Sequence, residues 1–199
     1  MRKLNLISAL QSEFATVEAV LKSGGSTRHV DALLLCWVKY EKQLRRLFSF
    51  LVFQHSNFTE QRTIDSVISE LVKNRQLNPE TFTKGIQQLT ARSVSDLLGT
   101  KYNTLHPQIN RIRCYRNKIM HGQISGDNIT SRRIERDIFY LIDWIETLAV
   151  AVESEFGYDG IRRNTDRSAK SSPRIAVANY PFNDVLGFGS WLTRLAERE

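Results

Sequence analysis

The stretch HVDALLLCWVKYEKQLRRLFSFLVFQ, residues 29–54, decides the fold class of this chain. Its apolar residues recur every three or four positions, which lines their side chains up along one side of an α-helix. The stripe is made of Val30, Leu33, Leu34, Trp37, Val38, Leu44, Leu47, Phe48 and Leu51. A stripe this wide is typical of a central helix that other helices cover, so the stretch predicts a helical core.

The same spacing continues on both sides of the central helix. Residues 5–21 predict a helix before it, and the turn-forming SGGST separates the two. Further helices are predicted from Asn57 to about Leu71, from Asn78 and Pro79 to near Thr90, over 93–99, from His106 to Met120, and roughly over 132–156. Because no convincing strand, repeat or βαβ alternation is found, the fold class is expected to be all-α, an up-down helical bundle.

The composition changes after Phe156. Residues 1–157 are predicted to form the bundle. Residues 158–174 are polar, basic and rich in turn formers, which predicts a basic linker or mobile loop. Residues 175–199 regain apolar character and are expected to be a C-terminal extension with a final helix around Asn183 to Arg198.

Composition and charge bound the class of protein. The 199 residues, 41% hydrophobic and 25% charged, suit one globular domain with an appendage. Cys36 and Cys114 sit among apolar residues and are predicted to be buried thiols of a reducing cytosol. No apolar run reaches membrane-spanning length, so a cytoplasmic protein without membrane contact is expected. The net charge of +7 favours a phosphate-bearing partner, nucleic acid above all.

Several kinds of catalytic site have no signature in the sequence. There is no cysteine pair, no HExxH, no phosphate-binding glycine loop and no GxSxG motif, so neither a metal nor a nucleotide cofactor is expected. His29, His55 and His106 have no other residue at a spacing that is typical of a catalytic or metal site.

The stretch RNKIMHG, residues 116–122, is the candidate site. Arg116 and His121 lie about 140° apart on a regular helix, whereas Asn117 and His121 share a face. Gly122 is the residue type that commonly ends a helix, so His121 is expected in the last turn, where the helix dipole favours a protonated imidazole. Asn117 is expected to hydrogen-bond that ring. A purely structural interpretation stays open, with His121 as a favourable charge at the helix end and Arg116 as a solvated residue.

In this setting RNKIMH resembles the Rx4–6H motif of HEPN domains, and the long helices on both sides resemble the HEPN helical bundle. The resemblance covers roughly residues 5 to 156. It implies a metal-independent endoribonuclease of bacterial toxin–antitoxin, abortive-infection or CRISPR-associated systems, usually a homodimer, although some members have lost catalysis. It also implies that Arg116 and His121 are the catalytic pair and that Asn117 is the polar residue following the arginine.

One position departs from the family pattern. HEPN toxins paired with minimal nucleotidyltransferases usually carry a tyrosine two residues after the histidine, where this chain has Gln123. The departure argues against that subfamily and against control by modification of the tyrosine.

The leading hypothesis is therefore an endoribonuclease that acts as a toxin or phage-defence effector, with RNA as substrate and an antitoxin or regulatory protein as a further candidate partner. RNA supplies its own nucleophile, the 2′-hydroxyl, so an imidazole and a guanidinium suffice for cleavage. The basic residues predicted to bind RNA are Arg111, Arg113, Lys118, Arg162 and Arg163. Two alternatives remain: a non-catalytic HEPN-like module that binds RNA or protein, and a basic DNA-binding protein, although no clear helix-turn-helix is present.

Overall fold

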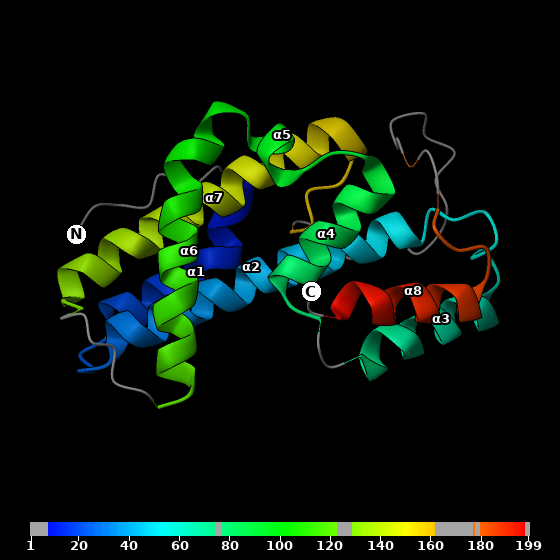
Figure 1. Cartoon of the computed structure of the whole chain (residues 1–199). Helices are drawn as coiled ribbons and strands as arrows, with labels where there is room; N and C mark the ends of the chain where they lie inside the picture. The colour runs from blue at the N-terminus through cyan, green and yellow to red at the C-terminus, as the bar shows by residue number, and fades with distance from the viewer. Residues whose placement is uncertain (1–7, 75–76, 123–128, 162–176, 178–179, 198–199) are drawn as a thin grey trace. The chain divides into compact units, whose positions relative to one another are not determined.

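The computed structural model describes residues 8–74, 77–122, 129–161, 177 and 180–197. Within these ranges there are eight helices and no strands (Figure 1), which confirms the predicted all-α fold. The chain forms two compact units, the first from residues 1–40 and 98–148, the second from 41–97 and 149–199. Helices α2 (Arg28–Val52) and α7 (Ser131–Phe156) contribute residues to both units.

Unit 1 combines the first part of α2 and most of α7 with α1 (Ser8–Lys22) and α6 (Thr100–Met120). Each helix buries one apolar stripe, and the four stripes form the core of the unit. Its largest buried residues include Phe14, Leu33, Trp37, Tyr40, Ile112, Leu141 and Trp144. In the view of Figure 1, α6 runs across α2 and α7 rather than along them, and side-chain contacts join it to both.

Unit 2 combines the rest of α2 with α3 (Gln61–Lys73), α4 (Pro79–Thr90) and α8 (Val185–Ala196). The final helix predicted from the sequence is present as α8, and it packs against both α3 and α4. Its Trp191 ring stacks on Phe48 of α2 with the ring centroids 5.7 Å apart. Just before α8, Phe182 stacks on Phe58 at 5.8 Å. The C-terminal residues therefore complete the aromatic core of this unit.

His55 is a buried structural residue of unit 2. Its Nδ1 accepts a hydrogen bond from the backbone N–H of Asn57 at 3.1 Å, so Nε2 carries the proton and donates to the Phe182 carbonyl, also at 3.1 Å. The resulting turn explains a wrong helix boundary. The sequence predicted a helix from Asn57, but α3 begins at Gln61, because the residues after α2 are held in this turn.

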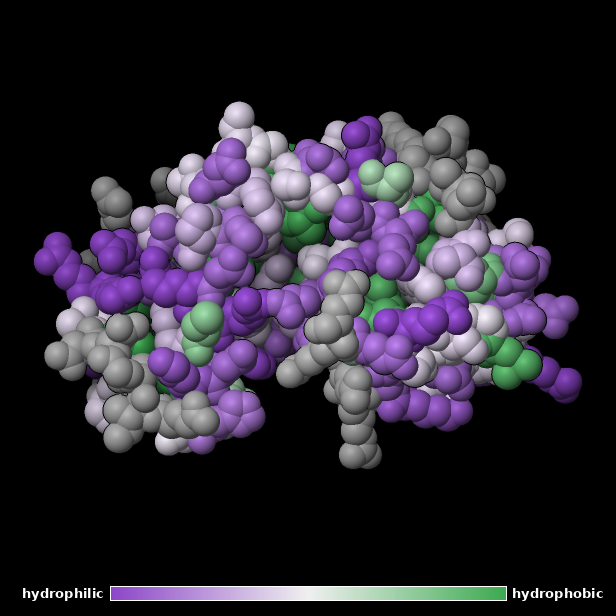
Figure 2. Space-filling model, in the orientation of Figure 1, coloured by the Kyte–Doolittle hydropathy of each residue, from purple (hydrophilic) through white to green (hydrophobic). Residues whose placement is uncertain are grey.

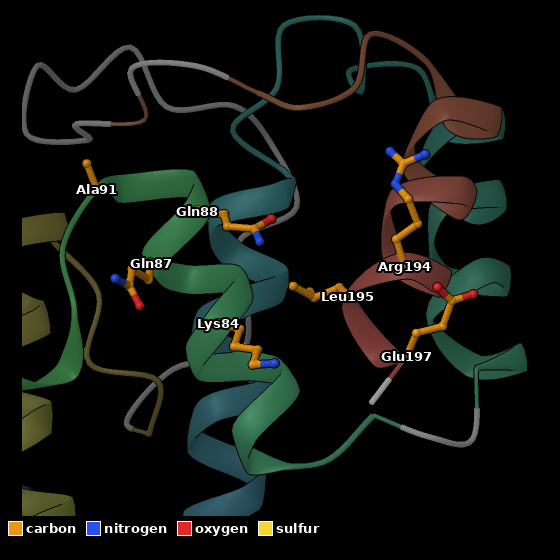
Figure 3. Close-up of a pocket in the computed structure, with 7 residues that line it drawn as sticks. All are labelled: Lys84, Gln87, Gln88, Ala91, Arg194, Leu195 and Glu197. Carbon is orange, nitrogen blue, oxygen red and sulfur yellow. The ribbon is translucent and has the colours of Figure 1, made fainter. Parts of the chain in front are cut away.

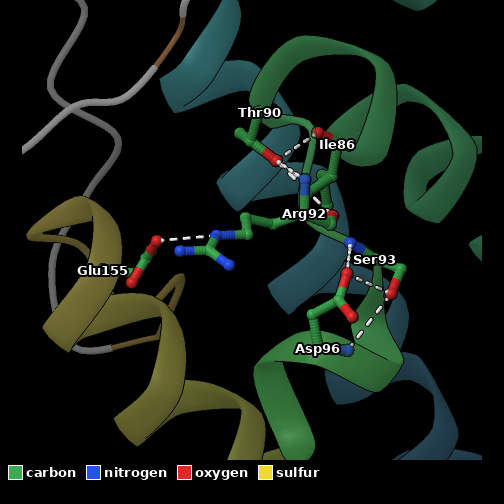
Figure 4. A network of polar contacts seen from close by, with 6 residues as sticks. All are labelled: Ile86, Thr90, Arg92, Ser93, Asp96 and Glu155. Carbon is green, nitrogen blue, oxygen red and sulfur yellow. Dashed lines mark hydrogen bonds and ion pairs between the residues drawn. The ribbon is translucent and has the colours of Figure 1, made fainter.

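Local capping follows the sequence closely at α4 and α5. The Asn78 side chain accepts from the Thr81 N–H at 3.0 Å and Pro79 opens α4, as predicted. At α5 (Val94–Leu98), Ser93 and Asp96 cap each other reciprocally, with the Ser93 N–H donating to Asp96 at 2.8 Å and the Asp96 N–H donating to Ser93 at 3.1 Å (Figure 4). The Ser93 hydroxyl also donates to the Asp96 carboxylate, at 2.6 Å, and this bond, followed by that of the Ser93 N–H, holds the pKa of Asp96 below its ordinary value.

The turn between α4 and α5 is tied further to α7. Thr90 Oγ1 donates to the Ile86 carbonyl at 2.7 Å and accepts from the Arg92 N–H at 3.2 Å. The Arg92 side chain then reaches Glu155 at 3.0 Å, as Figure 4 shows. Because both partners of this ion pair are substantially exposed, its contribution to stability is about 1 kcal/mol or less.

The predicted start of α6 is wrong by about two turns. Pro107 was expected near the beginning of the helix, but α6 begins at Thr100 and continues through the proline. Proline lacks the N–H that would bond the carbonyl of residue 103. Asn103 and Pro107 are both exposed, so water can satisfy that carbonyl and the helix is not interrupted.

Residues 158–161, the first of the predicted linker, are packed against α2 within unit 2. Arg46 donates to the Ile161 carbonyl at 2.8 Å, and Gln43 donates to the Asp159 carbonyl at 3.3 Å. Residues 162–174, including Arg162 and Arg163, lie outside the described residues, so their role as a basic arm stays a prediction.

The surface formed by the described residues is mostly hydrophilic on the face that Figure 2 draws. Hydrophobic residues show there in small separate spots. The large exposed apolar residues are Val38, Val72, Met120, Val150 and Leu186. Cys36 is buried, but Cys114 is exposed, which corrects the prediction of two buried thiols. Across the described ranges, none of the helices combines the length and apolarity needed to cross a membrane.

Gly85 makes a testable contribution to unit 2. A Cβ at this position would lie 2.4 Å from Phe48 Cε2 and 2.9 Å from Leu195 Cδ2. We expect Gly85→Ala to destabilise the protein by about 1–3 kcal/mol, because overpacking outweighs the gain in helix propensity of about 1 kcal/mol. Urea denaturation measures the change.

The matched control is Gly189→Ala in α8. There the nearest atom is the end of the flexible Glu70 side chain at 3.1 Å. We expect this variant to stay within about 1 kcal/mol of the wild type. Equal stabilities of the two variants would show that α4 does not depend on the close approach at Gly85.

Candidate functional site

The candidate site lies at the C-terminal end of α6, a helix whose charge is one-sided. Its 21 residues include five basic side chains, Lys101, Arg111, Arg113, Arg116 and Lys118, and no acidic one. The helix ends at Met120 with His121 as the C-cap residue. Gly122 follows in the left-handed conformation, at φ 64°, and donates its N–H to the Ile119 carbonyl at 3.0 Å. The predicted stop at Gly122 is therefore confirmed.

Asp137 of α7 anchors this helix through hydrogen bonds to two of its side chains. Its carboxylate is fully buried and accepts hydrogen bonds from the Arg111 guanidinium and from the Tyr115 hydroxyl, the latter at 2.5 Å. Arg111 also donates to the Gln108 side chain on its own helix. Because Arg111 and Tyr115 are four residues apart, both point from the same side of α6 to the same carboxylate.

The cluster of Arg111, Tyr115 and Asp137 has a defined protonation state and one unsatisfied donor. Burial, followed by the hydrogen bond to Asp137, raises the pKa of Tyr115 above its ordinary value, so the hydroxyl stays protonated and donates. Arg111 Nε is buried without a hydrogen-bond partner among the described residues, so the cluster is incompletely satisfied. A buried ion pair of this kind adds little net stability, but removing one partner leaves an uncompensated charge and is costly.

Arg116 is placed by α2. Its Cζ lies 5.8 Å from the centre of the Trp37 ring, which is almost fully buried, while Arg116 as a whole is half-exposed. Nη1 donates to the Asn117 side-chain oxygen at 3.0 Å. A cation at this distance from the face of an indole ring is attracted by the ring electrons. The arrangement therefore orients the planar cation at the surface of unit 1.

His121 and Asn117 are both exposed. The His121 backbone N–H donates to the Asn117 carbonyl at 3.1 Å, which completes the last turn of α6. Among the described residues, however, the Asn117 side chain is bonded to Arg116, and no hydrogen bond joins it to the His121 ring. The expected contact between Asn117 and the imidazole is therefore absent among the described residues, and the Asn117 oxygen accepts from the adjacent guanidinium instead.

Some of the predicted site residues lie together at the end of α6, and others do not. Arg116, Asn117 and His121 lie within the last turn of α6 and its cap. Lys118 is exposed on the same turn, and Arg113 is half-exposed one turn earlier. Arg111 points to Asp137 instead. Binding of RNA by the basic residues of α6 stays a prediction. Among the described residues, no group of histidine, cysteine and carboxylate side chains could hold a metal ion.

Sequence reasoning missed Asp137, Tyr115 and Trp37, which position the site. A signal for Asp137 was present, since it interrupts the apolar stripe formed by Ile134, Ile138 and Leu141 in α7. A lone acid among buried positions predicts a buried partner of opposite charge. The identity of that partner could not be read from the sequence, because Arg111 lies on another helix.

A separate groove lies in unit 2 between α4 and α8 (Figure 3). Its volume is about 800 Å³. Lys84 comes from α4 and Arg194 from α8, on opposite walls, and Glu197 adds the opposite charge. The charged side chains of the lining are exposed, so this hollow is an open surface groove rather than an enclosed site.

Comparison of the chain with protein-family models, curated proteins and solved structures finds no match, so the resemblance to HEPN domains rests on the RNKIMH motif and its helical setting.

The buried cluster generates a prediction for stability. We expect Asp137→Ala to lower the free energy of unfolding by about 3 kcal/mol or more, because it leaves the Arg111 charge partly buried without its partner. Urea denaturation followed by circular dichroism measures the loss.

Asp143→Ala on the same helix is the control. Asp143 pairs with Lys101 at 3.0 Å, but both side chains are about half exposed. This change should cost less than about 1 kcal/mol. If the two variants lose the same stability, Asp137 does not hold α6 as described.

Proposed function

We propose that the protein is a metal-independent endoribonuclease whose chemistry is carried out by Arg116 and His121. The supporting observation is the combination found at the end of α6. An exposed imidazole stands at the cap of the helix, and a guanidinium one turn earlier is oriented at the surface by Trp37. A buried cluster beneath them fixes the helix that carries both.

The proposed reaction is an attack of the RNA 2′-hydroxyl on the adjacent phosphorus. His121 takes the proton of the 2′-hydroxyl as the new P–O2′ bond forms. The P–O5′ bond breaks, and the leaving O5′ takes a proton from an imidazolium or from water. The products are a 2′,3′-cyclic phosphate and a 5′-hydroxyl. Because the nucleophile belongs to the substrate, the protein need only move protons and stabilise charge.

Arg116 is the group that stabilises the charge. A guanidinium offers parallel N–H donors whose geometry matches two phosphate oxygens. Its hydrogen bond to Asn117 and its contact with Trp37 reduce the freedom of the side chain before substrate arrives. Positive charge that is already in place needs little reorganisation as negative charge develops on the phosphate. Asn117 therefore has a positioning role in this proposal.

We further propose that the active form is a homodimer. On a regular helix Arg116 and His121 would lie about 140° apart, so a single helix end is not expected to place both on the same face. Two copies of the helix end around a twofold axis would bring two arginines and two histidines to one cleft. Met120, next to His121, has 58% of its surface exposed, and such a contact would remove it from water.

The biological setting follows from the resemblance alone. HEPN ribonucleases act in the bacterial cytoplasm as toxins or phage-defence effectors, with an antitoxin or regulatory protein as partner, and we propose the same setting here. A non-catalytic HEPN-like module that binds RNA or protein is the second candidate. The observation that favours it is the engagement of Arg116 with both Trp37 and Asn117, on a helix basic enough to bind RNA without cleaving it.

Alanine substitutions test the chemistry directly. In EDTA, the wild type should cleave labelled RNA, and Arg116→Ala and His121→Ala should each lower the rate by about a hundredfold or more. Both variants should keep their fold to within about 1 kcal/mol, because His121 is exposed and the contacts of Arg116 with Trp37 and Asn117 lie at a half-exposed position.

Lys118→Ala is the matched control, since it removes an exposed positive charge from the same turn. Its rate should fall far less than that of the other two variants. A wild type no more active than His121→Ala over a range of RNAs would refute catalysis and leave the binding module as the better proposal.

Mixing subunits tests the shared site. Wild type and an excess of His121→Ala are combined under conditions that allow exchange, and activity is measured on RNA. If two chains build one site, activity should fall well below that of the added wild type alone. Activity proportional to the wild-type concentration, together with an active monomer in light scattering, would contradict a shared site.

A further inference from the structure

One face of α6 carries a second set of side chains. Tyr102, His106, Asn110, Arg113 and Asn117 are separated by four, four, three and four residues, so they lie on the same side of the helix. The first four are half-exposed and Asn117 is exposed. This face leads along the helix toward His121.

Two aromatic rings at its start are already stacked. The centroids of Tyr102 and His106 lie 4.5 Å apart, with an angle of 15° between the ring planes. Trp144 lies beside both, at 5.9 Å from Tyr102 and 6.3 Å from His106, and is itself buried. Asn110 Nδ2 donates to His106 Nε2 at 3.1 Å and so limits rotation of the imidazole. The pair is therefore a partly exposed aromatic surface on a rigid support.

The charges around this face suit an anionic polymer. Helix α6 has no acidic residue. Two carboxylates of α7, Asp137 and Asp143, are paired with Arg111 and Lys101 of this helix. Arg113 lies on the same face as the ring pair, between it and the catalytic end. A base stacked on the rings would thus have its phosphates drawn along a basic helix.

We propose that the Tyr102–His106 pair binds a nucleobase of a single-stranded RNA substrate, with Asn110 beside it as a hydrogen-bonding group. This inference rests on the proposed ribonuclease function and adds the class of RNA that the site accepts. Aromatic rings combined with positive charge are the usual means of binding single strands, whereas bases in a duplex are not free to stack on protein. His106 and His121 are fifteen positions apart, which corresponds to roughly 22 Å along a helix, so the bound base belongs to a nucleotide several positions from the cleaved bond.

Binding is measured with 2′-O-methyl oligonucleotides, which lack the nucleophile and stay intact. Fluorescence anisotropy compares the wild type with Tyr102→Leu and His106→Leu. Each variant should bind about tenfold more weakly, with an unchanged salt dependence, because a stacking contact and no phosphate contact is lost. Tyr102→Phe keeps the ring and should bind with the affinity of the wild type. Thr104→Ala, an exposed change on another side of α6, should have no effect.

A second measurement needs no variant. A single abasic nucleotide is moved position by position along the oligonucleotide, and binding to the wild type is recorded. One or two positions should lose about tenfold in affinity, and that loss should be absent in Tyr102→Leu. Equal affinity at every position would overturn the proposal, even if the leucine variants fail to fold. So would duplex RNA that binds as well as the single strand and is equally sensitive to Tyr102→Leu.

The outcomes separate the two proposals. Cleavage without any dependence on the Tyr102–His106 pair overturns the base-binding site and leaves the ribonuclease standing. Base-dependent binding without cleavage supports the binding site and refutes the ribonuclease.

Discussion

The carboxylate of Asp137, buried between α6 and α7, is the interaction on which the rest of the site depends. It takes hydrogen bonds from Arg111 and Tyr115, which project from one side of α6. A helix held from one side at two positions cannot turn about its own axis without breaking both contacts. The side carrying Tyr102, Asn110 and Asn117 therefore has a fixed direction, and so does the last turn with Arg116 and His121.

The pairing of Asp137 with Arg111 contributes more to the orientation of α6 than to the free energy of unfolding. Transferring the Asp137 charge out of water costs several kcal/mol, and the attraction of Arg111 roughly offsets this cost. Apolar residues of similar volume often hold helices together equally well, and we infer that the directional hydrogen bonds of Asp137 instead select one rotation of α6. The contact between Arg116 and Trp37 adds a second restraint from α2. Unit 1 thus places a polar surface on a helix whose other side is part of an apolar core.

Local features of the fold were predictable from the sequence, and contacts between helices were not. The helix predicted for residues 29–54, the cap at Asn78 and the stop at Gly122 depend on neighbouring residues, and the structure bears out all three. One member of the predicted stripe was wrong, because Val38 is 53% exposed. The early start of α6 was missed because exposure of Pro107 decides whether a helix tolerates proline. The exposure of Cys114 and the pairing of Arg111 with Asp137 depend on which side of α6 faces α7. Periodicity alone does not settle that when polar residues occupy both sides.

We propose that the end of α6 cleaves RNA by attack of the substrate's own 2′-hydroxyl. Analysis of the RNA ends made by the wild-type protein in EDTA tests it most directly, with His121→Ala as the parallel sample. The account predicts 2′,3′-cyclic phosphate and 5′-hydroxyl ends that the variant does not produce. Ends bearing a 3′-hydroxyl and a 5′-phosphate, or RNA that stays intact with the wild type, would contradict it.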